Sequence, residues 1–286
     1  MDSELTKRAI GFMGRQTQAK KPFFAFVPYT QPHMPTIPHP QFKNKTHNGD
    51  FADVLAEIDA HVGQLLDAVD ELGIHDHTIF VFTSDNGPEF STGYEGFSGP
   101  WRGTYFTAWE ASLRVPFIIR WPGKVPAGAL NNEIVHEMDL FPTFAQIAGG
   151  KVPKDRIIDG IDQTDLFLGR KDKSDRESVI IYVGNELCGV KWRNWKMMSK
   201  ELDDATGPVK TYGLPRFYDL HIDPKEEHPL GPQLPENLWV RWPMGQVLLD
   251  HIASLKKEPP IRPGTSDPYD PSRKTESAPE TKVPVD

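Results

Sequence analysis

The sequence predicts an α/β protein: a central sheet sandwiched between helices, with a smaller C-terminal antiparallel sheet plus a helix. Two observations support this fold class. Helix-like and strand-like patterns alternate through the first 83 residues, whereas beyond residue 150 the pattern changes to short strands separated by turns. A chain of 286 residues is long enough for one large domain with an appendage. We expect the large domain in residues 1–150, the small one in 151–257 and a disordered tail in 258–286.

The first predicted elements are a helix over residues 3–16 and a buried strand over 23–27. Ser3 is the expected N-cap of the helix, and the strand is the apolar run Phe-Phe-Ala-Phe-Val after Pro22. A proline-rich loop follows the strand and holds His33. A lone loop histidine is more often simply solvated, but its place at a strand's carboxyl end makes His33 a candidate ligand-facing residue.

The clearest helix pattern covers residues 50–72, with Asp50 as the expected N-cap and Gly73 at the C′ position. It leads into a strand over 78–83. By the right-handed crossover rule, this strand should be parallel to the strand at 23–27, so that both carboxyl ends meet at one edge of the sheet. Groups that follow the two strands could therefore converge on one site.

The strand over 78–83 runs directly into Ser-Asp-Asn-Gly. Asp85 offers a carboxylate, Asn86 a neutral amide oxygen, and Gly87 lets the chain turn away at once. Adjacent hard oxygens suit a divalent cation such as calcium or magnesium. A strand that ends in an Asx turn is the alternative interpretation.

Residues 89–114 form a long loop rich in glycine and aromatic residues, and loops of this length inside a domain are usually functional. Its two cations are Arg102 and Arg114, and either could pair with Glu110. A further strand is predicted over 115–121.

The remaining elements are shorter. His136 and Asp139 precede a short helix that passes through Leu140 and Ile147. The small sheet should contain strands over 178–183 and 188–198 and an edge strand that begins at Phe217, and a last helix should span 242–255. From residue 256 onward Pro, Ser, Thr, Lys and Glu dominate, which predicts disorder.

Composition excludes several classes of function. The net charge of −8 argues against a nucleic-acid partner. No apolar run approaches the roughly 20 residues of a membrane span, so no transmembrane segment is expected. The first eight residues contain no apolar signal core. The single cysteine, Cys188, excludes a disulfide framework and a cysteine-based zinc site.

Several blocks of the sequence, taken in order, resemble the sulfatase family. The pair formed by Glu57-Ile-Asp-Ala-His-Val and Thr83-Ser-Asp-Asn-Gly is similar to the family's most recognisable helix–strand pair, and the loop Pro32-His-Met-Pro resembles its substrate-side histidine. The other matching blocks are Lys21-Pro-Phe-Phe-Ala-Phe-Val, Pro100-Trp-Arg-Gly, Leu113-Arg-Val-Pro, Arg120-Trp-Pro-Gly, Met138-Asp-Leu-Phe-Pro-Thr, Asp159-Gly-Ile-Asp and Trp192-Arg-Asn-Trp-Lys. The resemblance covers residues 5 to about 230 without a break in order.

This resemblance implies an alkaline-phosphatase-like fold and hydrolysis of a sulfate ester, on a small molecule or a saccharide. It implies Ca²⁺, or Mg²⁺ in some members, held partly by Asp85 and Asn86. His33 would be the catalytic residue and would face the sulfate, with Arg102 as a second candidate substrate-binding residue. The metal would neutralise sulfate oxygens as the S–O bond breaks. Members are often exported, and the sequence leaves the compartment open.

Two departures from the family pattern concern chemistry. Sulfatases carry an early Asp-Asp pair that binds the same metal and a Cys-x-Pro-Ser-Arg motif whose cysteine becomes formylglycine, the nucleophile; neither occurs here. Many members also have a sulfate-binding lysine five residues before Glu110, where this chain has Tyr105. We therefore expect a C-terminal portion of an arylsulfatase-type enzyme that is inactive alone. The alternatives are a phosphate or phosphonate ester hydrolase of the same fold, or a non-catalytic sulfatase-like remnant.

Overall fold

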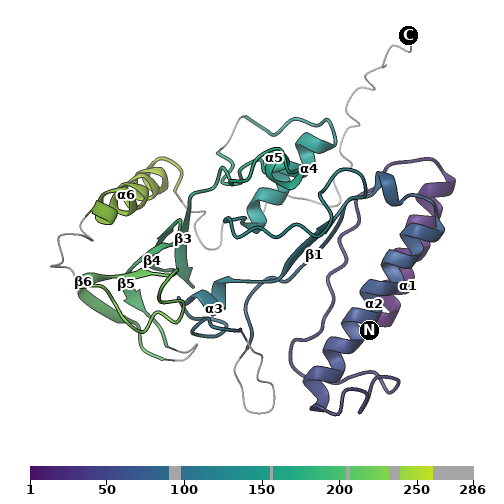
Figure 1. Ribbon diagram of the computed structural model, residues 1–286, viewed down its shortest axis with the longest axis horizontal. Coiled ribbons are helices and arrows are strands. Elements are labelled where there is room, and N and C mark those ends of the chain that lie inside the picture. The colour runs from purple at the N-terminus through teal and green to yellow at the C-terminus, as the bar shows by residue number, and fades with distance from the viewer. Residues whose placement is uncertain (90–97, 155–156, 204–206, 232–238, 260–286) are drawn as a thin grey trace, which may run out of the picture. The chain divides into compact units, whose positions relative to one another are not determined.

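The computed structural model describes residues 1–89, 98–154, 157–203, 207–231 and 239–259 (Figure 1). The chain divides into two compact units, Met1–Leu248 and a second unit from Leu249 onward. The described part of the second unit is the end of the last helix, in residues 249–259. The predicted boundary at residue 150 stays a prediction, and most of the predicted disordered tail lies outside the described residues.

The helices of the described residues are α1 (Asp2–Gln18), α2 (Gly49–Glu71), α3 (Glu110–Leu113), α4 (Leu140–Ile147), α5 (Thr164–Phe167) and α6 (Arg241–Lys257), with 3₁₀ turns η1 (His75–His77) and η2 (Glu137–Asp139). The strands are β1 (Phe80–Thr83), β2 (Phe117–Arg120), β3 (Ser178–Val183), β4 (Glu186–Trp192), β5 (Trp195–Glu201) and β6 (Lys210–Asp219). None of the helices within these ranges has the length and apolarity that a membrane crossing requires.

The helices α1 and α2 lie side by side and share one apolar core (Figure 1). Met13 of α1 packs there against Leu65 and Val69 of α2, in the 3.6-residue pattern that predicted both helices. The C-terminus of α2 is the predicted one. Gly73 has a φ of 67° and donates to Asp70, and the next amide, Ile74, donates to Val69.

Both predicted N-caps are wrong by two residues. α1 begins at Asp2 after Met1, and α2 begins at Gly49 after Asn48. The side chains that seemed to be caps are bound elsewhere. Ser3 contacts His61, with Oγ and Nε2 3.4 Å apart, and Asp50 forms an ion pair with Lys43.

The predicted strand at 23–27 is not a strand in the structure. Phe23 packs on the α1–α2 core, but Phe24 and Phe26 are 74% and 79% exposed. A strand exists only through hydrogen bonds to a neighbour, and no described strand pairs with this segment. The expected strand parallel to β1 is therefore absent from the described residues, where β1 pairs with β2, antiparallel, with Thr83 opposite Phe117.

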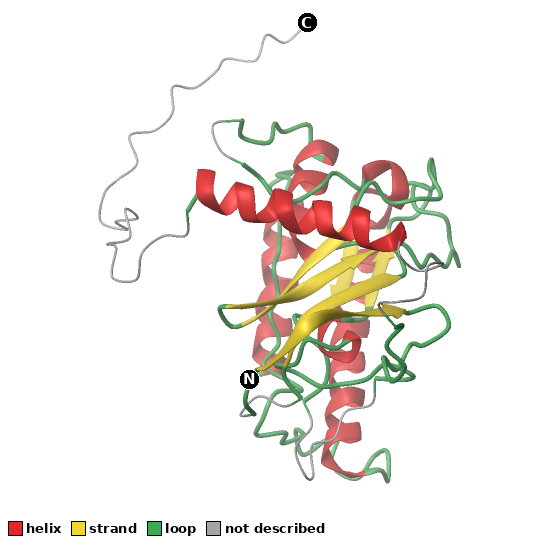
Figure 2. Cartoon of the chain, turned by 90° about the vertical axis from the view of Figure 1, so that its left-hand side faces the viewer, coloured by secondary structure: helices red, strands yellow, loops and turns green. Residues whose placement is uncertain are grey.

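The small sheet is confirmed, with four antiparallel strands in the order β3-β4-β5-β6 and β6 at an edge, although β6 begins at Lys210 and not at the predicted Phe217. One face packs on the first half of α6 through a cluster that includes Val190, Met197, Phe217 and Met244 (Figure 2). Its other face packs on Ala108 and Trp109, from the loop that precedes α3. The sheet therefore lies between α6 and the segment that follows β1, which ties the small sheet to the β1 region.

Candidate functional site

The turn after β1 places two oxygen ligands side by side in solvent-accessible positions. Asp85 is exposed, and its one described hydrogen bond is a long one from the Ser84 hydroxyl, at 3.5 Å. Asn86 is half-buried, and its Nδ2 donates to the carbonyl oxygen of Gly87 at 2.9 Å. The amide's other atom, Oδ1, accepts no hydrogen bond from the described residues.

Gly87 explains why the chain can turn here. Its backbone lies so close to α3 that a Cβ would sit 1.6 Å from the carbonyl oxygen of Ala111. The Gly87 amide donates to Ser112 at 3.0 Å, and the Pro88 carbonyl accepts from Tyr105 at 2.9 Å. The turn that bears Asp85 is therefore held against the segment around α3.

The oxygen atoms of Asp85 and Asn86 fit part of the coordination of a calcium or magnesium ion. An exposed carboxylate and a free amide oxygen are hard ligands, but calcium takes about six to eight of them. Among the described residues no group of three or more His, Cys, Asp or Glu side chains could hold a metal ion. Asp85 and Asn86 could thus supply part of a coordination sphere.

A second carboxylate near this turn was not foreseen from the sequence. Burial first, and then the negative charge of Asp85, raise the pKa of Glu137, which lies in η2. Residue spacing gave no signal for this, because 52 positions of chain separate residues 85 and 137. The tertiary structure brings them into electrostatic reach.

His33 lies exposed in the proline-rich loop, and its ring is fixed by a hydrogen bond between Nδ1 and the carbonyl oxygen of Met34 at 2.7 Å. A carbonyl only accepts, so Nδ1 carries the hydrogen and Nε2 is the nitrogen left for a ligand. The ring borders an open pocket of about 490 Å³, whose lining also includes Thr30, Gln31 and Met34.

Carboxylates of the helix pair hold this loop in place. Asp2 is 3% exposed; its Oδ1 accepts from the amide and hydroxyl of Thr30, and its Oδ2 from the amide of Gln31 at 3.1 Å. Glu57 of α2 accepts from the His39 amide at 2.7 Å. The expected convergence of His33 with Asp85 and Asn86 stays a prediction, since the described lining of the pocket contains neither residue.

Arg102 is engaged in contacts within the fold. Its guanidinium lies 3.9 Å from the ring centroid of Trp109, and it donates to the Glu226 carbonyl at 3.1 Å and to Asp203 at 3.4 Å. Its role in substrate binding stays a prediction. Of the two arginines that could pair with Glu110, the one that does so is Arg114, with Nε and Oε2 2.7 Å apart.

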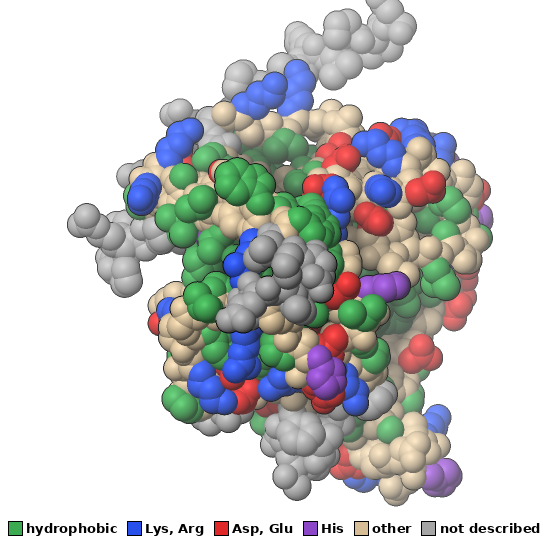
Figure 3. Space-filling view, turned by 60° about the vertical axis from the view of Figure 1, so that its left-hand side comes forward, with side chains coloured by type: hydrophobic (Ala, Val, Ile, Leu, Met, Phe, Trp, Pro, Cys, Tyr) green, Lys and Arg blue, Asp and Glu red, His purple; other side chains and the backbone are tan. Residues whose placement is uncertain are grey.

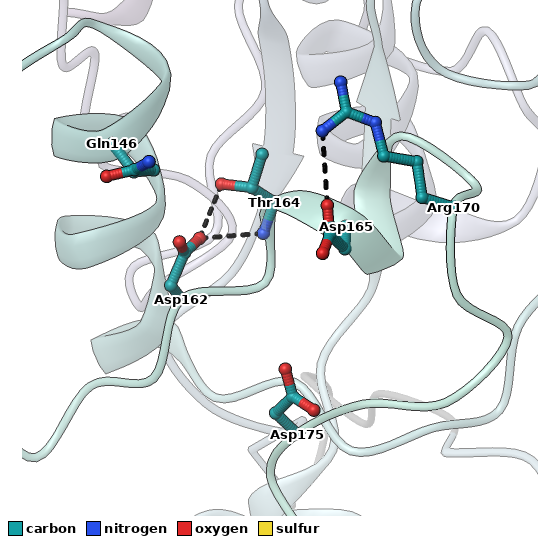
Figure 4. Close-up of a pocket in the computed structure, with 6 residues that line it drawn as sticks. All are labelled: Gln146, Asp162, Thr164, Asp165, Arg170 and Asp175. Carbon is teal, nitrogen blue, oxygen red and sulfur yellow. Dashed lines mark hydrogen bonds and ion pairs between the residues drawn. The ribbon is translucent and has the colours of Figure 1, made fainter.

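A second pocket, of about 250 Å³, lies between α4, α5 and the chain before β3 (Figure 4). It is lined by Gln146, Asp162, Thr164, Asp165, Arg170 and Asp175. Each carboxylate there already has a partner: Asp162 accepts from Thr164, Asp165 pairs with Arg170 at 3.2 Å, and Asp175 with Lys171 at 2.8 Å. Two of these carboxylates are thus paired with cations and the third is held by Thr164, and the described residues of the pocket include no group of three that could hold a metal ion.

Charged side chains of both signs are interspersed with apolar ones on the face shown in Figure 3. The net charge of −8 is therefore spread rather than gathered on that face. An anionic substrate would therefore depend on local cations or a metal.

Comparisons with known proteins agree on one family. The profile described as "Sulfatase" matches residues 1–150, and that described as "N-sulphoglucosamine sulphohydrolase, C-terminal" matches residues 105–233. The chain is 30% identical to steryl-sulfatase of Rattus norvegicus, over 91% of this chain and 50% of that protein. It is also 30% identical to N-acetylgalactosamine-6-O-sulfatase of Bacteroides thetaiotaomicron, over 81% of this chain and 48% of that protein.

Solved structures give the same result. The PsFucS1 sulfatase from Pseudoalteromonas sp. superposes with a TM-score of 0.86 at 29% identity, over 92% of this chain and 54% of that one. The expected alkaline-phosphatase-like fold is confirmed by such neighbours. The chain spans about half the length of the curated relatives it matches. With a family profile over more than half of its residues and these relatives, the chain belongs to the sulfatase family.

Proposed function

We propose that this chain contributes to the hydrolysis of a sulfate ester by supplying part of a divalent-metal site and a proton donor to the leaving oxygen. The observation that carries the proposal is the turn after β1. There Asp85 and the Oδ1 of Asn86 have almost no partners within the described protein, in the segment matched by the sulfatase profile.

His33 suits the role of proton donor. With Nδ1 bound to the Met34 carbonyl, the protonated ring presents Nε2–H toward the adjoining pocket. As the S–O bond breaks, that hydrogen would pass to the oxygen of the departing alcohol, and the ring would become neutral. The carboxylate of Asp2 supports this role by fixing the backbone of Thr30 and Gln31 next to the histidine.

A calcium ion at Asp85 and Asn86 would supply positive charge to the sulfate oxygens. The nucleophile that the family resemblance implies, a formylglycine made from Cys-x-Pro-Ser-Arg, has no counterpart in this sequence. The one cysteine, Cys188, is buried in the small sheet. We therefore infer that turnover needs residues beyond those of this chain.

The test combines a binding and an activity measurement. Calcium is titrated into the chain by calorimetry, with Asp85→Asn as the variant and Asp175→Asn as the exposed control. We expect weak binding that Asp85→Asn removes and the control keeps. No binding at millimolar calcium would leave Asp85 and Asn86 as turn residues.

Activity is measured on the chain alone and on the longest open reading frame that contains it. The esters compared are 4-nitrocatechol sulfate, a steroid sulfate, N-acetylgalactosamine 6-sulfate and 4-nitrophenyl phosphate. We expect negligible turnover by the chain alone, and EDTA-sensitive sulfate release by any longer product that includes Cys-x-Pro-Ser-Arg. Preferential hydrolysis of the phosphate ester would contradict the assignment to sulfate esters.

A further inference from the structure

A buried ion network joins the small sheet to the segment that supports the candidate metal-binding turn. Lys191 of β4 and Lys196 of β5 stand directly opposite each other across the strand pair. Like charges in this arrangement repel unless counter-charges lie between them. Glu110, the first residue of α3, provides one: its Oε2 lies 2.6 Å from the Nζ of Lys191, and its Oε1 3.4 Å from that of Lys196.

Glu226 provides the other counter-charge. Its Oε1 lies 2.6 Å from the Nζ of Lys196, and its Oε2 accepts the backbone N–H of Glu110 at 2.8 Å. The side chains of Glu110, Lys196 and Glu226 are fully buried, and Lys191 is 12% exposed. The network therefore fixes both the side chain and the backbone of Glu110, where α3 begins.

A buried network of this kind is a poor source of net stability, because desolvation of the charges offsets much of their attraction. Its effect on geometry is direct, because these ion pairs and the hydrogen bond to the Glu110 amide link residues of α3, β4 and β5 with Glu226. The element that the network holds in place is α3, a single short turn that extends only to Leu113.

Backbone contacts lead from α3 directly to the turn after β1. The Gly87 amide donates to Ser112, and the Gly87 Cα packs against the carbonyl oxygen of Ala111. A parallel contact runs from the Tyr105 amide to the Pro88 carbonyl at 2.9 Å. Gly87 follows immediately after Asp85 and Asn86, so any displacement of α3 moves the backbone next to both ligands.

We propose that Glu110 and its two buried lysines, Lys191 and Lys196, are positioning residues that hold the Asp85–Asn86 turn in the conformation that receives a divalent cation. The effect on cation binding rests on the proposed function. The effect of the network on the position of the turn does not depend on that function. The lysines of the network lie in the small sheet, and the candidate metal ligands lie after β1. The two are connected through α3, where Glu110 belongs to the network and Ala111 and Ser112 contact Gly87.

The first test measures amide hydrogen exchange at Gly87 and Tyr105 by NMR, in the metal-free chain. The variant is Lys191→Met, and the matched control is Lys200→Met, which removes a more exposed ion pair with Glu186 from the same sheet. We expect exchange at Gly87 to be at least about tenfold faster in Lys191→Met while the amide of Val190 changes little. The control should alter neither amide.

Two further variants separate charge from shape. Lys191→Arg keeps the charge and should keep most of the protection at Gly87. Arg114→Met removes a half-exposed partner of Glu110, so it tests the same network if Lys191→Met does not fold. It should speed exchange at Gly87 by a smaller factor. Unchanged exchange at Gly87 in both Met variants, or an equal rise at every amide of the sheet, would overturn the proposal.

Calcium titration of the same variants connects the network to the site. We expect Lys191→Met to weaken binding several-fold and Asp85→Asn to remove it. If the unmodified chain binds no calcium while Gly87 still responds to Lys191→Met, the proposed function fails and the positioning role stands. Suppose instead that Lys191→Met binds calcium as tightly as the unmodified chain while amide exchange at Gly87 is altered. That result would refute the role of the network in positioning Asp85 and Asn86.

Discussion

Gly87 and Ala111 approach each other so closely that no side chain fits between them: a Cβ on Gly87 would lie 1.6 Å from the carbonyl oxygen of Ala111. This contact fixes the direction in which the chain leaves the Asp85–Asn86 turn. It also joins two segments that lie more than twenty residues apart in the sequence. The requirement for glycine here is therefore one of space.

The substitution Gly87→Ala should displace the turn from α3. We expect a loss of about 1–3 kcal/mol in the free energy of unfolding, because the added methyl group overpacks a backbone contact. Urea unfolding measures this. Gly63→Ala is the matched control, since nothing lies within 4 Å of a Cβ at that position inside α2. It should be stabilising by about 0.5–1 kcal/mol; equal effects of the two substitutions would refute the steric argument.

The substitution Asp2→Ala should loosen the loop that carries His33. Asp2 accepts three hydrogen bonds from Thr30 and Gln31. Hydrogen bonds to a charged group are worth about 1.5–3 kcal/mol, so we expect a loss of that order and faster amide exchange at Thr30 and Gln31. Glu4→Ala, in the same helix, removes only an exposed ion pair with Arg8, so this control should leave the free energy of unfolding close to that of the wild type. Unchanged exchange at Thr30 in Asp2→Ala would contradict the role of Asp2.

The substitution Asp139→Asn should be among the most destabilising in the chain. Asp139 is fully buried and accepts hydrogen bonds from Nε and Nη2 of Arg176, at 2.9 and 2.6 Å. An unpaired buried guanidinium costs about 3–5 kcal/mol, which urea unfolding detects. Asp175→Asn breaks only the exposed pair with Lys171 and serves as the control. A loss below about 1 kcal/mol in Asp139→Asn would show that water reaches Arg176.

The acid stability of the protein should depend on Glu110. Burial alone would raise the pKa of this carboxyl, but the charges of Lys196, Lys191 and Arg114 outweigh burial and lower the pKa from 4.5 to about 2. A lowered pKa in the folded protein means stability that is present above pH 4.5 and is lost as the pH falls toward 2. The pKa of Glu226 shifts in the opposite direction. Burial raises it, and this outweighs the lowering effect of the Lys196 charge.

Urea unfolding of wild type and Glu110→Gln at pH 6 and at pH 3 isolates this contribution. At pH 6 the variant should be less stable by about 3 kcal/mol, the value that corresponds to a pKa shift of this size. At pH 3 the difference should shrink by about 2 kcal/mol, since folding then gains less from the ionised Glu110. A difference that is the same at both pH values would show that folding does not lower the pKa of Glu110.

Local patterns in the sequence predicted those helices and strands whose formation depends mainly on residues close to them in the chain. The apolar period of α2, its glycine stop at Gly73 and the strands around Trp192 were all found where expected. The strand at 23–27 was not, because a strand also needs a partner, and its apolar composition carries no information about where that partner is. The N-caps failed because the side chains have other partners: Ser3 contacts His61 of α2, and Asp50 pairs with Lys43 in the chain before α2.

The sequence by itself determined the family, most helices and strands apart from the one expected at 23–27, and the candidate residues Asp85, Asn86 and His33, because these follow from short motifs and their spacing. Only the tertiary structure decided what supports them. Lys191 and Lys196 look like ordinary strand lysines until the fold buries them on either side of Glu110. Glu137 enters the surroundings of Asp85 in the same way. Electrostatic and steric contacts depend on distance in space, and the fold sets those distances between residues that the chain keeps far apart.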